Sequence, residues 1–198
     1  IVSILYNNLI QKSKTTNRTF VFISVLWAIT ACFYSNRNQI LFHSQHAKYE
    51  QAEKLCFAGY SSEGMEMLKE VYPVMKRDVN YLTLLGREHM KNENYHDALI
   101  LFKEAGKIRP SNELYRLIGL CYDGLGHFKE AGKHLLTAVT MVPNRFVTRF
   151  ELFVFYKKHH QYKECKSTGL AILKLPVKVA SPTVEWIRNA VEGELKNL

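Results

Sequence analysis

Apolar residues recur every three to four positions between residues 79 and 145, and the whole pattern repeats after 33 residues. This spacing places side chains on one face of an α-helix, whereas a strand would alternate them. A fixed period of this length predicts a solenoid of stacked helical units. The positions that match between the two units are Gly86 and Gly119, Tyr95 and Phe128, Ala98 and Ala131, Phe102 and Leu135, Ala105 and Ala138, and Pro110 and Pro143.

Each unit divides into two helices. In the unit that begins near Asn112, Gly119 lets the neighbouring helix approach closely, and the glycine-containing stretch 124–126 ends the first helix. Alanines on the second helix are small enough for tight antiparallel packing, and Pro143 ends that helix. The pattern resembles that of tetratricopeptide repeats, which implies an all-α solenoid of antiparallel helix pairs with no long strand between residues 80 and 145. We expect the pairs to divide near Gly59, 92–94, 124–126 and 159–161.

The two flanking units are degenerate, as terminal repeats usually are, because one of their faces meets a cap instead of a neighbour. Gly64 stands in the upstream unit where a packing alanine is expected, and Cys165 does so downstream. Other positions keep the repeat outline: Tyr49, Ala52, Leu55, Gly59, Leu68 and Pro73 upstream, and Phe150, Leu152, Tyr156 and Tyr162 downstream. The repeat domain is therefore predicted over residues 37–180.

A final helix is predicted over residues 181–198. Ser181 can cap its N-terminus, and Pro182 suits its first turn. An apolar stripe on this helix can seal the last repeat. The stripe consists of Val184, Ile187, Val191 and Leu195.

The N-terminal region contains 18 uncharged residues at 19–36, which is just long enough to span a membrane as a helix. The apolar stretch 1–10 is expected to be the end of an earlier membrane helix, so that 1–18 comprises this end and a short basic loop. Lys12, Lys14 and Arg18 would place that loop on the cytoplasmic side. A buried core helix or a secretory signal is the alternative, although a signal peptide would not usually carry an apolar stretch before its basic segment.

Three features are narrower than the repeat pattern: the phrases at 141–146 and 176–182, and a membrane helix directly ahead of the repeats. Together they resemble the C-terminal region of the O-antigen ligase and polymerase-like membrane proteins of Bacteroidetes, over roughly residues 19–198. The resemblance implies a polytopic membrane body that transfers a lipid-linked glycan, with this chain as its tail. Since the chain begins at Ile1 without a methionine, we expect it to be part of a longer protein. The family's chemistry lies in the membrane body, so no catalytic residue is carried over.

Composition and motifs give little support to catalysis or metal binding. Cys32, Cys56, Cys121 and Cys165 form no CxxC pair, so no metal site is indicated and core packing is favoured for those in the repeats. The eight histidines show no ligand or triad spacing, and the glycines at 119–126 lack the strand context of a phosphate loop. The sequence therefore indicates no cofactor, and any enzymatic activity would belong to the parent protein.

Positive charge is the remaining functional signal. The chain carries 27 Lys and Arg against 18 Asp and Glu, a formal charge of +9, but this charge is spread out, which makes nucleic-acid binding a weak interpretation. The first helices of successive repeats should line a concave groove, and basic residues there would favour an anionic partner. The predicted binding residues are Arg87, Lys91, Arg116, Lys157 and Lys158. The alternative is an ordinary solvated helix face, and Asp123 would moderate the field.

These observations leave three hypotheses. The first is a membrane-tethered interaction domain of a glycan ligase or polymerase in the bacterial inner membrane, with its repeats in the periplasm. Such a domain would hold a partner protein or an anionic, lipid-linked glycan acceptor. The second is a membrane-anchored adaptor that binds peptide segments and has no link to glycan chemistry. The third, an autonomous enzyme, has no nucleophile, metal or acid/base set to support it.

Overall fold

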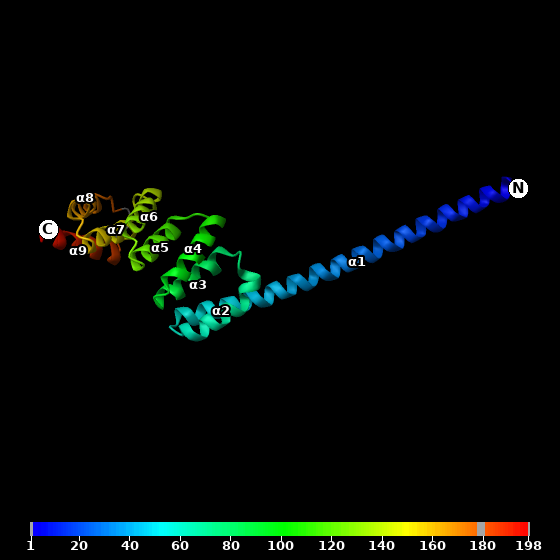
Figure 1. Cartoon of the computed structure of the whole chain (residues 1–198), viewed down its shortest axis with the longest axis horizontal. Helices are drawn as coiled ribbons and strands as arrows, with labels where there is room; N and C mark the ends of the chain where they lie inside the picture. Colours follow the sequence, from blue (N-terminus) through cyan, green and yellow to red (C-terminus); the bar gives the residue numbers. More distant parts are fainter. Residues whose placement is uncertain (1, 178–180, 198) are drawn as a thin grey trace. The chain divides into compact units, whose positions relative to one another are not determined.

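The computed structural model describes residues 2–177 and 181–197, with side chains from residue 23 onward. These residues form nine helices and no strand, which confirms the predicted all-α class. The helices are α1 (Val2–Phe57), α2 (Ser61–Met75), α3 (Val79–Lys91), α4 (Tyr95–Ile108), α5 (Asn112–Gly124), α6 (Phe128–Met141), α7 (Phe146–Lys158), α8 (Tyr162–Leu173) and α9 (Pro182–Leu195), shown in Figure 1.

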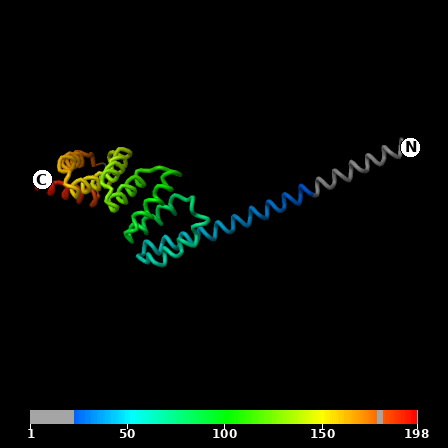
Figure 2. The backbone as a smooth tube through the Cα atoms, in the orientation of Figure 1, coloured from blue at the N-terminus to red at the C-terminus, as the bar shows by residue number. Residues whose placement is uncertain are grey.

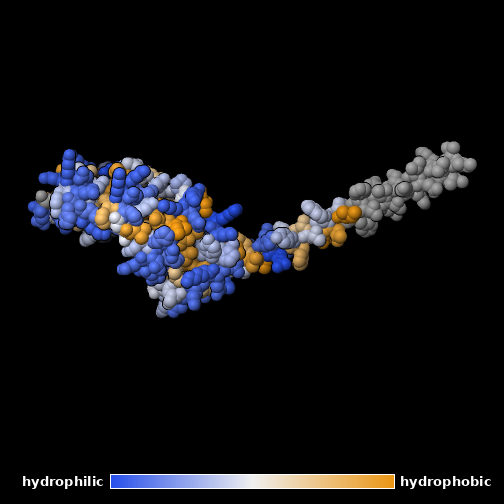
Figure 3. Space-filling view, in the orientation of Figure 1, coloured by the Kyte–Doolittle hydropathy of each residue, from blue (hydrophilic) through white to orange (hydrophobic). Residues whose placement is uncertain are grey.

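The chain divides into two compact units, residues 1–48 and 49–198. The first unit is the greater part of α1, which runs without a break through residues 11–18, where a loop was expected. That stretch holds no glycine or proline to end a helix. From residue 23 onward the helix exposes large apolar side chains, including Leu26, Trp27 and Phe33, and some of them are visible as orange atoms in Figure 3.

Among the residues whose side chains the structure describes, no helix carries an apolar stretch long enough to cross a membrane. The membrane helix predicted at 19–36 begins four residues before that part of the chain. The side chains of residues 1–18 lie outside it entirely, so the membrane segment predicted there stays a prediction.

The second unit is a row of helix hairpins. The C-terminal end of α1 pairs with α2, where Gly64 lies against Cys56 and Ala52. The pairs α3/α4, α5/α6 and α7/α8 follow, with α9 packed on α7 and α8 (Figure 2). The turns fall at the four positions predicted from the sequence.

All four turns share one backbone arrangement. A residue with positive φ follows each first helix: Gly59, Glu93, Gly126 and His160. The N–H after it donates to the carbonyl five residues back, as Asn94 does to His89 and His127 does to Tyr122. This is the Schellman arrangement, which satisfies carbonyl groups left open at the helix end.

Small residues inside each hairpin allow the two helices to approach. Ala98 and Ala131 are completely buried, as predicted. A Cβ added to Gly119 would lie 2.8 Å from Leu135 Cγ, so glycine is required at that contact. Gly64 replaces alanine in the first hairpin because Cys56 occupies the space, with its Sγ 2.4 Å from where a Cβ would be.

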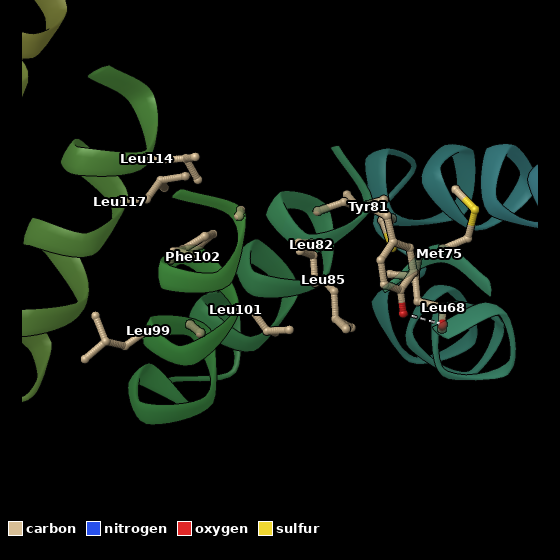
Figure 4. Close-up of a cluster of buried hydrophobic side chains, with 14 of the residues drawn as sticks. Leu68, Met75, Tyr81, Leu82, Leu85, Leu99, Leu101, Phe102, Leu114 and Leu117 are labelled. Atoms are coloured by element: carbon tan, nitrogen blue, oxygen red, sulfur yellow. Dashed lines mark hydrogen bonds between the residues drawn. The ribbon is translucent and has the colours of Figure 1, made fainter. Parts of the chain in front are cut away.

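The main core runs between the first and third hairpins. Tyr81 is fully buried there, and its hydroxyl donates to the carbonyl of Leu68 over 2.7 Å, as Figure 4 shows. Burial raises the pKa of the Tyr81 hydroxyl well above its usual range. Cys121 and Cys56 also lie in this core, as predicted for packing cysteines, whereas Cys32 is exposed.

A separate cluster seals the C-terminal end. Ile187 and Val191 of α9 are buried against Phe153, Cys165 and Ile172 of the last hairpin. The side chain of Ser181 accepts a hydrogen bond from the N–H of Val184, which is the predicted helix cap.

Candidate binding face on the first helices

The second, fifth and ninth residues of α3, α5, α7 and α9 form one continuous surface, which we call the first-helix face. These positions follow a spacing of three and four residues, so they share one side of each helix. None of the side chains is fully buried. The face consists of Asn80, Thr83 and Arg87 on α3, Glu113, Arg116 and Leu120 on α5, Val147, Phe150 and Val154 on α7, and Thr183, Trp186 and Ala190 on α9.

Ion pairs connect the first three of these helices. Arg87 of α3 pairs with Glu113 of α5 at 2.5 Å. Arg116 donates two hydrogen bonds to Glu113, at 2.7 and 3.0 Å, and a third to Glu151 of α7 at 2.6 Å. The bidentate contact with Glu113 fixes the plane of the Arg116 guanidinium. Together these residues form a row of alternating charges across the three helices.

The partly buried carboxylates of this row depend on Arg116 for charge compensation. Arg116 is only 14% exposed, and Glu151 Oε2 is buried without a hydrogen-bond partner in the described part of the chain. The hydrogen bonds from Arg116 lower the pKa of Glu113, although burial opposes this. Burial raises the pKa of Glu151, and the charge of Arg116 offsets only part of that rise. Burial also disfavours the charged form of Arg116, but the two carboxylates outweigh it and raise the arginine's pKa.

A second group of ion pairs lies at the C-terminal ends of the same helices. Asp123 of α5 accepts a hydrogen bond from Lys158 over 2.8 Å, and its other oxygen lies 2.6 Å from His159 Nε2. Lys157 turns to the other side of α7 and pairs with Glu194 of α9. Each of these contacts joins one first helix to the next.

Lys91 occupies the corresponding place on α3. Its ammonium group donates to Glu88 at 2.6 Å and reaches the carbonyl of Cys56 at 3.5 Å. Glu88 is only 1% exposed, and a buried carboxylate needs such a partner because desolvation is costly.

The five predicted basic residues therefore do not form one block of positive charge. Arg87 and Arg116 meet at Glu113, whereas Lys91, Lys157 and Lys158 are each paired with a different carboxylate. Asp123, which the sequence predicts will moderate the field, pairs with Lys158. A role of these five residues in binding an anion stays a prediction, and the side chain of Arg87, 44% exposed, is the more accessible of the two arginines.

The C-terminal part of the face is apolar. Trp186 is 60% exposed and meets Phe150 edge to face, with ring centroids 5.3 Å apart. Val147 and Val154 are exposed beside them on α7. Phe150 belongs to the predicted repeat pattern, whereas Trp186 lies outside the apolar stripe predicted for the last helix. The signal was available, because each is the fifth residue of its helix.

The described residues hold no group of three or more His, Cys, Asp or Glu placed to bind a metal ion.

No protein-family model matches the chain, and no curated protein matches it. Solved structures do match. The MamA RS-1 ArsTM double mutant has 17% identity and a TM-score of 0.62, over 66% of this chain and 74% of its own. A MamA structure from Desulfovibrio magneticus RS-1 has 17% identity and a TM-score of 0.56, over 77% of this chain and 76% of its own.

YrrB, described as a TPR protein with an unusual peptide-binding site, has 16% identity and a TM-score of 0.56, over 76% of this chain and 77% of its own. At such identities the likeness concerns the fold, and it says nothing about the O-antigen ligase resemblance. In fold, the chain is a tetratricopeptide-type helical solenoid.

Proposed function

We propose that this protein is a scaffold that binds an extended peptide segment of a partner along its first-helix face. The observation that carries the proposal is an apolar group on this one face, in which the exposed Val147, Val154 and Trp186 surround the half-buried Phe150. Single exposed apolar residues are ordinary on proteins, but a contiguous patch marks an interaction site. Peptide binding in YrrB, a neighbour in fold, is consistent with this use of the architecture.

The two ends of the face suit different parts of a peptide. Phe150 and Trp186 offer apolar area and an indole N–H, which suits an aliphatic or aromatic side chain. Arg87 has guanidinium donors beyond its bond to Glu113, which suits a backbone carbonyl or a carboxylate. The ligand would therefore carry its apolar residue over α7 and α9 and its acceptor groups over α3.

The test is a selection of peptides from a displayed random library on the full chain, followed by binding measurements with the enriched peptides. Trp186→Ala should weaken their binding by at least about tenfold, which corresponds to roughly 1.4 kcal/mol. Tyr60→Ala is the matched control, because Tyr60 is an exposed aromatic residue outside the face. Enriched peptides that bind the Trp186 variant as well as the wild type would refute the proposal.

The finer form of this function is a membrane-tethered tail of an O-antigen ligase or polymerase-like protein, with the repeats in the periplasm. It rests on the sequence resemblance and on the exposed apolar side chains of α1 between residues 23 and 34. A cysteine placed at Lys129, in a background without Cys32, should then react with a membrane-impermeant thiol reagent in intact spheroplasts. Reaction only after lysis would place the repeats in the cytoplasm and favour the adaptor.

A further inference from the structure

A second candidate surface lies where α6 meets α7, away from the first-helix face. The structure has a hollow of about 290 Å³ there. Its lining residues come from α6, from the end of α7 and from the turn that follows: Phe128, Lys129, Gly132, Lys133, Leu136, Phe155, Tyr156 and Gln161.

The hollow lies where one repeat has a glycine in place of a leucine. Leu99 is the fifth residue of α4 and is buried in the main core. The fifth residue of α6 is Gly132, which has no side chain to fill the equivalent junction. A Cβ at Gly132 would meet only the ring of Phe155, at 3.1 Å. The apolar side chains of Phe128 and Leu136, on the same side of α6, are left about half exposed.

The charge around the hollow differs from that of the first-helix face. Lys129 and Lys133 lie one turn apart on α6, and both are exposed. Neither has a carboxylate within ion-pair distance among the residues that the structure describes. Tyr156, in the lining, has a raised pKa, chiefly because of burial and also because of the negative charge of Glu164. That charge offsets part of the positive field of the two lysines.

We propose that this hollow binds an acidic peptide segment of a partner protein, with one bulky apolar side chain seated between Phe128, Leu136 and Phe155. Carboxylates on either side of that residue would face Lys129 and Lys133. Pockets for small ligands usually measure about 300 Å³ or more, so the volume of this hollow is at the small end of that range. It suits a single side chain better than a cofactor. A second copy of this chain is a poor occupant, because each copy carries a formal charge of +9.

The test measures fluorescence anisotropy of a labelled nine-residue peptide, composed of glutamates around a central leucine, with the full chain. Gly132→Leu copies the residue present at Leu99 and should weaken binding at least about tenfold by filling the hollow. Lys129→Ala with Lys133→Ala should weaken binding at low salt and flatten its salt dependence, because screening acts on the charge pairs. A peptide with asparagine in place of the central leucine should bind the wild type as weakly as the leucine peptide binds the Gly132→Leu variant.

Circular dichroism and thermal unfolding check that the Gly132 variant keeps its fold. Leu136→Asn, at a half-exposed position, serves as a second variant that removes apolar lining without overpacking. Tyr60→Ala, outside both surfaces, should leave this peptide's affinity unchanged. Binding that is lost in Trp186→Ala and kept in Gly132→Leu would assign the peptide to the first-helix face and overturn the proposal. Equal binding to wild type and to both lining variants would overturn the proposal, as would absence of any binding by the wild type.

Two other occupants are outcomes of the same experiment. Co-sedimentation with phosphatidylserine vesicles that requires Lys129 and Lys133, without peptide binding, would assign the lysines to a lipid surface instead. Self-association that Gly132→Leu abolishes, measured by light scattering, would assign the hollow to a second copy of the chain. Either result contradicts the peptide proposal.

Discussion

Ala131 shows at the scale of one residue how closely the hairpins are packed. It is completely buried, and its carbonyl would lie 3.2 Å from a Cβ added to Gly119. We expect Ala131→Leu to overpack the α5/α6 hairpin and to lower stability by about 1–3 kcal/mol. Thermal unfolding checks this, with Thr140→Leu on the exposed side of the same helix as the control. An unchanged melting temperature for Ala131→Leu would contradict the packing described above.

Glu113 provides a prediction of pH dependence. Its pKa is lower in the folded protein, chiefly because Arg116 donates hydrogen bonds to it. Its carboxylate therefore stabilises the fold above the unfolded-state pKa, and this contribution is lost as the pH falls through the folded-state pKa. We expect Glu113→Gln to cost about 1–2 kcal/mol at pH 7, and to narrow the difference in stability between pH 7 and acid.

Glu151 contributes in the opposite sense, because burial raises its pKa in the folded state and its ionised form is disfavoured there. Denaturant titrations of the wild type, Glu113→Gln and Glu151→Gln at neutral and acid pH separate the two. If stability changes with pH in the same way in the wild type and in Glu113→Gln, the ion pair between Glu113 and Arg116 does not govern the pH dependence of stability.

At the scale of the helix, the hairpin turns reveal strain in two of four cases. Gly59 and Gly126 adopt positive φ without steric cost, whereas Glu93 and His160 adopt it with a Cβ. Glu93→Gly should stabilise the protein by roughly 1 kcal/mol, since the left-handed conformation costs other residues about that much. Urea denaturation measures the effect, and Gly126→Ala should lower stability in the same assay. A destabilised Glu93→Gly would mean that the glutamate side chain contributes more than its backbone costs.

The sequence specified these elements well because their signals are local. Glycine or asparagine marks three of the four turns, and the alanines at 98 and 131 mark the tight contacts between helices. Contacts between repeats were not predictable in the same way. Arg116 lies three residues after Glu113 on the same helix, but only the stacking of α3 on α5 brings Arg87 to the same carboxylate. The basic groove was therefore expected to be more positive than it is.

The hollow at Gly132 was missed for a related reason. A glycine in a helix reads as neutral or mildly unfavourable by itself. It becomes informative only when compared with Leu99 at the same register in the previous repeat, and when Phe155 is seen across the junction.

For the whole repeat unit, stability should be divided among neighbours, because the main contacts of the described helices α3 to α9 lie within a hairpin or between consecutive ones. Ile187→Ala would open a cavity between α9 and the last hairpin, at a cost of about 2–5 kcal/mol. Hydrogen exchange should then accelerate in α7, α8 and α9, while amides around Tyr81 keep their protection. Ile23→Ala, at an exposed position of α1, is the control. Uniform acceleration across the whole unit would indicate a single cooperative core.

The ion pairs between first helices have a consequence for how such an array can evolve. Arg116 and Glu151 are 35 residues apart, as are Asp123 and Lys158. Each pair therefore joins the first helix of one hairpin to the first helix of the next. Deleting the α5/α6 hairpin would remove Arg116 and Asp123 and leave Glu151 buried beside Thr83, the uncharged residue of α3 at the register of Arg116. The repeats of this chain are consequently not interchangeable units, because the ion pairs between first helices form only when the repeats follow one another in this order.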